Sequence, residues 1–91
     1  MNYQKLDGSL AMALNDVMEP ETPNLVVFIH TQSPLEPDAI AILENKGVNN
    51  ITDSQDIFTA TVSADTIAQL SEQSWVRYLK LSHKLRLANR A

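Results

Sequence analysis

Leu25-Val-Val-Phe-Ile-His-Thr31 and Ile57-Phe-Thr-Ala-Thr-Val62 are the two stretches that decide the fold. The first is apolar and β-branched almost throughout, as is typical of a central strand covered on at least one face. In the second, apolar side chains at positions 58, 60 and 62 alternate with Ile57 and two threonines, which is the two-residue period of a strand with one oilier face. The sequence therefore predicts a strand at each place.

A helical pattern follows each of these strands. Apolar residues from Ala39 to Leu43 predict a helix that Gly47 can end in the left-handed conformation. Its start has two interpretations, a capping box from Ser33 to Glu36 or Pro37 as the first helical residue, and the second fits better. After residue 62 a second helix is expected, capped by Ser63 and led by Asp65. Its inner stripe is formed by Ala64, Ile67, Ala68 and Leu70.

Two weaker strands complete the predicted sheet. Val48 and Ile51 indicate a short strand from Val48 to Thr52. The Asp53–Asp56 stretch that follows has the composition of a hairpin turn. Val76 to Leu81 is the last strand, and Trp75 before it is expected to cover the core. The order βαββαβ from residue 25 to 81 predicts a ferredoxin-like α+β domain. Its four-stranded antiparallel sheet would carry both helices on one face.

Residues 1–24 form a separate segment in this interpretation. Their apolar residues recur at helical spacing, and Asp7 can cap the start of a helix. Pro20 and Pro23 mark a linker behind it. The apolar face must be buried on the main domain or against another chain. The residues on this face are Leu10, Ala13, Leu14, Val17 and Met18. Met12 and Met18, on or near it, are expected to be packing residues.

Composition indicates one small globular domain with a polarised charge. The 91 residues suffice for a single core, and without cysteine there is neither a disulfide nor a thiolate metal site. Residues 1–72 hold all 11 acidic residues and two of the seven basic ones, a net charge of −9, whereas residues 73–91 carry +5. The basic tail, residues 82–91, is interpreted either as a solvated segment attracted to the acidic body or as a docking segment for an acidic partner. With no secretory signal and no bilayer-spanning run, a cytoplasmic protein is expected.

The second half of the domain resembles the propeptides and propeptide-like inhibitors of subtilisin-type proteases. The resemblance is carried by Phe58-Thr-Ala-Thr-Val-Ser-Ala-Asp-Thr-Ile-Ala-Gln-Leu70, then Ser74-Trp-Val-Arg-Tyr-Leu79 and His83. The strand from Leu25 and the helix ending near Gly47 suit the first half. The resemblance spans about residues 25–91 and leaves residues 1–24 outside.

This resemblance implies a non-enzymatic inhibitor or folding helper of a subtilisin-like serine protease. One face of the sheet would lie on the protease, with Arg77, Lys80 and His83 facing the partner, while the tail enters the substrate cleft. The family often has acidic residues just after the last strand, where this chain has Lys80 and Ser82. No protease domain follows Ala91, so binding is expected in trans. The protease-binding tail comprises Lys84, Leu85, Arg86, Leu87, Ala88, Asn89, Arg90 and Ala91.

Catalytic and cofactor motifs are not found. Two glycines cannot build a phosphate loop, and His30 and His83 lack the spacing of a metal or triad site. Asp53 and Asp56 suit a turn better than a carboxylate pair. We therefore expect no enzyme activity, cofactor or metal.

RNA and small ligands are two other classes of partner that sheets of this topology bind. RNA binding through Phe28, Phe58 and Tyr78 is disfavoured because the strands at 25–31 and 57–62 contain no lysine or arginine. The loop between the first strand and helix lacks the glycine usual in ligand-binding domains of this topology. Neither nucleic acid nor membrane is expected as a partner. The runner-up interpretation is a ferredoxin-like interaction module that self-associates, for example as a homodimer, and has no protease target.

Overall fold

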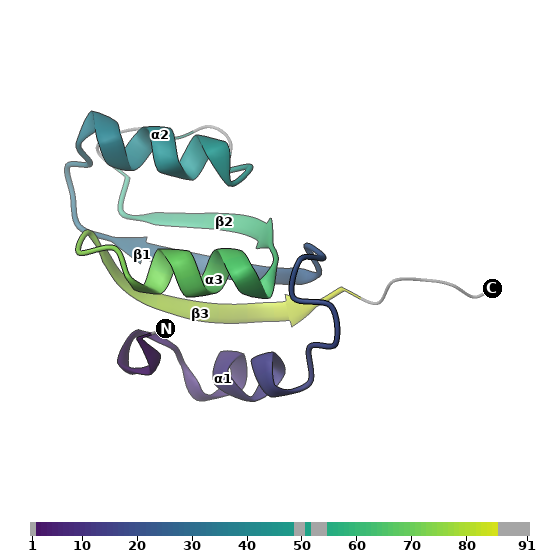
Figure 1. The fold of residues 1–91 in the computed structure, drawn as a ribbon. Coiled ribbons are helices and arrows are strands. Elements are labelled where there is room, and N and C mark those ends of the chain that lie inside the picture. Colours follow the sequence, from purple (N-terminus) through teal and green to yellow (C-terminus); the bar gives the residue numbers. More distant parts are fainter. Residues whose placement is uncertain (1, 49–50, 52–54, 86–91) are drawn as a thin grey trace.

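The computed structural model describes residues 2–48, 51 and 55–85. Its elements are η1 (Tyr3–Lys5), α1 (Gly8–Asn15), β1 (Leu25–Thr31), α2 (Pro37–Asn45), β2 (Ile57–Val62), α3 (Ala64–Ser71) and β3 (Val76–Lys84). The strands form one antiparallel sheet in the order β2-β1-β3, so the first strand lies in the middle (Figure 1). The protein is therefore α+β, as predicted.

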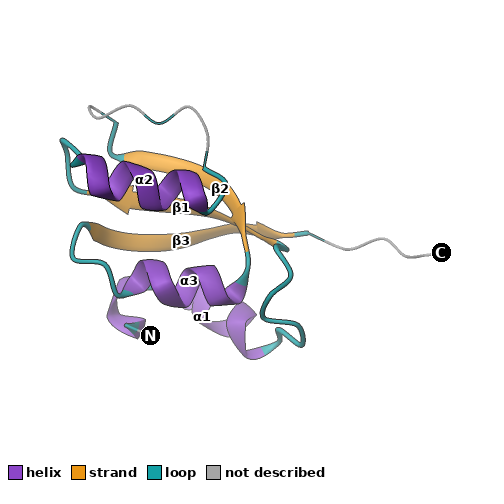
Figure 2. Ribbon diagram, turned by 45° about the horizontal axis from the view of Figure 1, so that its top comes forward, coloured by secondary structure: helices purple, strands orange, loops and turns teal. Residues whose placement is uncertain are grey.

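The core lies between the sheet and the helices α2 and α3, which cover the same face of the sheet (Figure 2). Burial alternates along β1 and β2, and every second side chain points into this layer. Full burial of a Leu, Ile or Phe side chain contributes about 1.5–3 kcal/mol, so these contacts dominate the stability of the sheet. The largest buried core side chains are Phe58, Leu10, Leu25, Ile29, Leu43, Ile67, Leu70 and Leu79.

The predicted helix starts are confirmed. The Leu10 amide donates to Asp7 Oδ1 (3.0 Å), and the Thr66 amide donates to Ser63 Oγ (3.1 Å), so both side chains cap their helices. Pro37 is the first residue of α2 with Glu36 before it, which decides between the two predicted starts.

The expected four-stranded sheet is wrong, because the sheet in the described residues has three strands. Val48 was predicted to begin the additional strand, but it lies instead at the C-terminal end of α2. Its amide donates to the Leu43 carbonyl (3.0 Å), and the Gly47 amide donates to the Glu44 carbonyl (3.1 Å). This is a Schellman motif, with Gly47 at φ +90°. Val48 is buried because such motifs seat an apolar residue against the helix, and residues 49–50 and 52–54 lie outside the described part.

The N-terminal segment seals the outer edge of β3. Leu6 pairs with Leu79 in a parallel bridge, and the Asp7 amide donates to the Leu79 carbonyl (3.0 Å). The Leu81 amide in turn donates to Asp7 Oδ1 (3.1 Å). An edge strand with unpaired backbone groups invites aggregation, so this cover protects β3.

Helix α1 is shorter than the periodicity predicts. It ends at Asn15 with Asp16 as its C-cap, and of its predicted stripe Leu10 and Ala13 are buried in the core. The expectation that the methionines pack inside is wrong, since Met12 is 70% and Met18 93% exposed. Met18 lies beyond the helix end, where the helical period no longer applies. None of the described helices is long and apolar enough to cross a bilayer.

Strand β3 runs three residues further than expected, to Lys84, although Ser82, His83 and Lys84 give no apolar strand signal. The extension arises from pairing with β1, where Leu25 faces Lys84 and Val26 faces His83. The pairing shifts register twice and leaves Arg77 and Ser82 as extra, bulged residues. The predicted tail therefore begins as part of the sheet.

Candidate functional site

The second face of the sheet is covered by none of the described helices. Val26, Phe28 and His30 of β1 are half-buried and lie on it, because they alternate with the fully buried residues of the core face. The paired strands contribute the side chains beside them. We call this surface the open face and define it by Val26, Phe28, His30, Ile57, Thr59, Thr61, Tyr78, Lys80 and His83.

The open face is apolar in the middle and differs at its two sides. Phe28 lies between Thr59 of β2 and Lys80 of β3 in the ladder. His30 lies between Ile57 and Tyr78, and its ring meets that of Tyr78 edge to face with centroids 5.8 Å apart. The β2 side is uncharged and the β3 side is basic.

A shallow depression of about 380 Å³ lies at the end of the open face where β1 finishes. Arg77, the bulged residue of β3, lines it together with His30, Tyr78 and Ile57. Asp56, just before β2, and Thr31 complete the lining. The bulge thus brings a guanidinium beside the aromatic pair, where a regular strand would have kept its neighbours on alternating faces.

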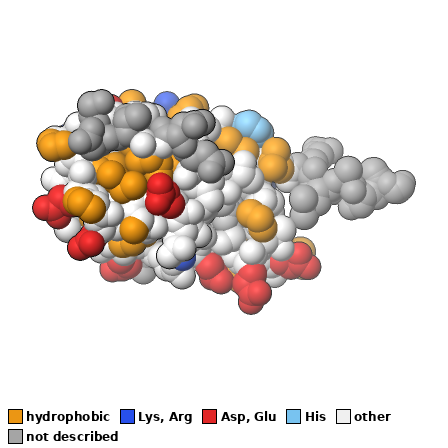
Figure 3. Space-filling model, turned by 90° about the horizontal axis from the view of Figure 1, so that it is seen from above, with side chains coloured by type: hydrophobic (Ala, Val, Ile, Leu, Met, Phe, Trp, Pro, Cys, Tyr) orange, Lys and Arg blue, Asp and Glu red, His pale blue; other side chains and the backbone are white. Residues whose placement is uncertain are grey.

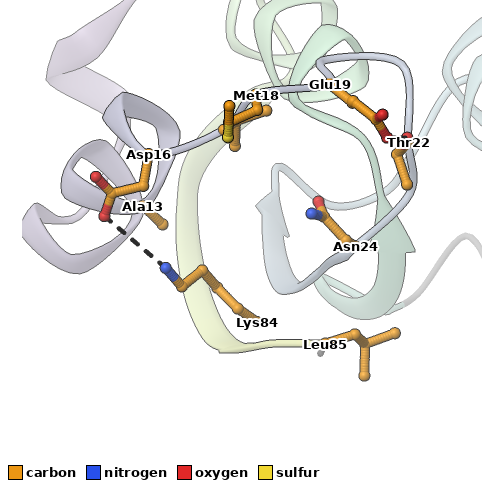
Figure 4. Close-up of a pocket in the computed structure, with 9 residues that line it drawn as sticks. Ala13, Asp16, Met18, Glu19, Thr22, Asn24, Lys84 and Leu85 are labelled. Carbon is orange, nitrogen blue, oxygen red and sulfur yellow. Dashed lines mark hydrogen bonds and ion pairs between the residues drawn. The ribbon is translucent and has the colours of Figure 1, made fainter. Parts of the chain in front are cut away.

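The base of the tail is attached to the domain on the opposite end of β1. The Leu85 amide donates to the Asn24 carbonyl (2.8 Å), and Lys84 Nζ lies 3.9 Å from the Asp16 carboxylate (Figure 4). This ion pair is 50% and 75% exposed, so it contributes at most about 1 kcal/mol. Asp16, Lys84 and Leu85 line a hollow of about 750 Å³, and Leu85 is 40% exposed there.

The structure places the predicted partner-facing residues on one side of the sheet. Lys80 and His83 lie on the open face and Arg77 lies at its end, all three exposed. Of the predicted tail, Lys84 and Leu85 are described, and the residues expected to bind the cleft from Arg86 to Ala91 lie outside the described part.

The sequence did not single out Val26, named Tyr78 only for the disfavoured RNA binding, and offered no role for His30. The missing signal was the alternation of β1. Its run of apolar residues hides which side chains face the helices, and only the pairing with β2 and β3 reveals it.

The two histidines are far apart in the sheet and have different neighbours. His83 Nδ1 lies 3.1 Å from the hydroxyl of the adjacent Ser82, and both side chains are exposed. Among the described residues no carboxylate bonds to either imidazole, and no group of three or more His, Asp or Glu is placed to hold a metal ion. The chemistry that the open face offers is apolar contact, aromatic stacking and positive charge.

Comparison with known proteins adds no relative. No protein-family model matches the chain, and neither a curated protein nor a solved structure is similar to it at a significant level.

Proposed function

We propose that this protein is a non-enzymatic binding protein that engages a subtilisin-like serine protease in trans, through its open face and its C-terminal tail. The observation that supports this proposal best is the continuity between the two. Strand β3 contributes Tyr78, Lys80 and His83 to the open face and then leads directly into the tail at Leu85. A partner that covers the face therefore meets the start of the tail.

The strand order is compatible with the fold that the resemblance implies. With β1 between β2 and β3, the sheet has the order of a ferredoxin-like domain without its second strand. Helices α2 and α3 lie on the same face, as in that arrangement. In the resembling propeptides the opposite face lies on the protease, and here that is the open face.

The size of the open face indicates that the tail must take part. Three strands spaced about 4.8 Å apart and about seven residues long give a face of roughly 330 Å². A stable complex buries about 800 Å² on each partner, so the face alone falls short by more than half. The six residues that follow Leu85 would reach about 20 Å in an extended conformation and could add a strand to the edge of a cleft. The proposal therefore needs both surfaces at once.

The tail is tested by titrating the full chain and a version lacking residues 86–91 against a panel of subtilisin-type proteases. The cut is placed after Leu85 because its amide closes the sheet at Asn24. We expect inhibition by the full chain and a loss of at least about 100-fold on truncation, since each tenfold change is only about 1.4 kcal/mol of tail contacts. Circular dichroism and Trp75 fluorescence check that the truncated chain keeps its fold.

A matched control keeps the tail length and its charges. Leu85→Ser/Leu87→Ser removes the apolar candidates for the cleft subsites and leaves Arg86 and Arg90 in place. If apolar side chains occupy the subsites, this variant weakens inhibition almost as much as truncation does. A full chain that inhibits no member of the panel and forms a stable dimer would contradict the proposal and favour the self-association module.

A further inference from the structure

We infer that the partner of the open face presents an acidic surface to β3, a conclusion that rests on the proposed function and specifies the protease it fits. The first observation is the distribution of charge over the fold. The three strands contain no Asp or Glu, although the chain has 11 of them, and they contain Arg77, Lys80 and Lys84. Every acidic residue in the described part of the chain therefore lies in a helix, a cap or a loop.

Most acidic side chains that Figure 3 shows lie along one side of the molecule, while Asp56 lies at the end of the open face, in the lining of the depression. In Figure 3, which looks down on the end where α2 lies, most of them occupy the lower part of the view. The separation of the open-face cations from most of the acidic caps, helices and loops produces a field directed across the thickness of the sheet. A partner is oriented by this field before contact, with its negative surface toward the sheet.

Two cations of β3 have no partner within the part of the chain that the structure describes. Lys5 Nζ donates to the Gln73 carbonyl (2.6 Å) and Lys84 pairs with Asp16, so both are engaged inside the domain. Arg77 and Lys80 are exposed, and neither side chain forms a hydrogen bond or ion pair with a described residue. These two charges are thus left for a partner.

The positions of Arg77 and Lys80 suit one contact patch. Lys80 lies beside Phe28 on the β3 side of the face, and Arg77 lines the depression at its end. Three residues of strand separate them by about 10 Å, which is about one Debye length at 0.1 M salt. The two charges therefore act together on an approaching surface. Because they stand at the rim of an apolar centre, their main effect is on the association rate.

The test compares two charge reversals that leave the protein with the same net charge. Lys80→Glu changes the open face, while Lys46→Glu makes the same change at the end of α2, away from it. Association with the protease that the wild type inhibits most strongly is followed by stopped flow at about 20 mM and about 500 mM salt, between which screening becomes nearly complete. Circular dichroism confirms that both variants are folded.

We expect Lys80→Glu to slow association about tenfold at low salt and about twofold at high salt, whereas Lys46→Glu stays within about twofold of wild type. Arg77→Glu, as a second variant, should behave like Lys80→Glu. Equal rates for the wild type and Lys80→Glu at low salt, with inhibition intact, overturn this inference alone. Failure of the wild type to inhibit any protease overturns the proposed function and the inference with it.

Discussion

Asp7 joins two distant parts of the chain through one carboxylate oxygen. Its Oδ1 accepts from the Leu10 amide at the start of α1 and from the Leu81 amide on the outer edge of β3. A capping residue usually serves its own helix alone, and here the same atom also satisfies a sheet edge. Position 7 thus determines both where α1 begins and where it sits.

We predict that Asp7→Ala lowers the free energy of unfolding by about 2 kcal/mol, since it removes a helix cap and leaves an edge amide without its acceptor. Asp7→Asn keeps an oxygen at the same place and should retain most of the stability. Urea unfolding followed by circular dichroism measures both. Equal losses in the two variants would show that charge, rather than the acceptor, matters at this position.

Substitution by alanine is expected to have opposite effects on stability at the two glycines. Gly47 has φ +90°, so Gly47→Ala strains the backbone although nothing lies within 4 Å of an added Cβ, and we expect a loss of about 1 kcal/mol. Gly8 is the first residue of α1, also with free space around it, and Gly8→Ala should gain several tenths of a kcal/mol from helix propensity. Thermal unfolding of the two variants provides the comparison, and a shift of the same sign in both would contradict the Schellman geometry of Gly47.

At the level of elements, α1 is part of the same core as the sheet. Leu10 is fully buried in that core, whereas Met12, two residues later, is 70% exposed. Leu10→Ala should therefore lower the free energy of unfolding by about 2–5 kcal/mol, as buried Leu-to-Ala changes do, and Met12→Ala by about 0.5 kcal/mol or less. Chemical denaturation measures the difference. Similar small effects in both would mean that α1 is only loosely attached.

Elements with a strong local signal could be predicted from the sequence. The strands at 25–31 and 57–62, the caps Asp7 and Ser63 and the helix start at Pro37 are confirmed, because these signals act within a few residues. The failures involve partners distant in sequence. Ser82–Lys84 become strand only by pairing with β1, and Val48 was assigned to a strand because its apolar side chain packs against the helix it closes.

The candidate site followed the same division. The resemblance pointed to Arg77, Lys80 and His83, and they lie on one side of the sheet, although His83 is beyond the predicted strand end at Leu81. The apolar centre of the open face was not predicted, because β1 is apolar on both faces and only its pairing shows that Phe28 points outward.

As a whole molecule, residues 2–24 and the sheet should unfold together. The Asn2 amide donates to Ser71 Oγ (3.0 Å) at the end of α3, and Lys5 Nζ donates to the Gln73 carbonyl in the loop before β3. The N-terminal segment is thus attached to both places as well as to the core. We predict one two-state transition in urea, with coincident curves for Trp75 fluorescence and helical circular dichroism. An earlier loss of helical signal, before Trp75 responds, would contradict this.

The two bulges of β3 fix its register against β1. A strand interrupted at Arg77 and again at Ser82 cannot slide along β1, because any displacement would misplace both irregularities. The position at which the tail leaves the sheet is therefore fixed. Each residue inserted after Leu85 would lengthen an extended tail by about 3.3 Å without changing the domain. Under the proposed function, tail length would then select partners by the depth of their clefts, independent of tail composition.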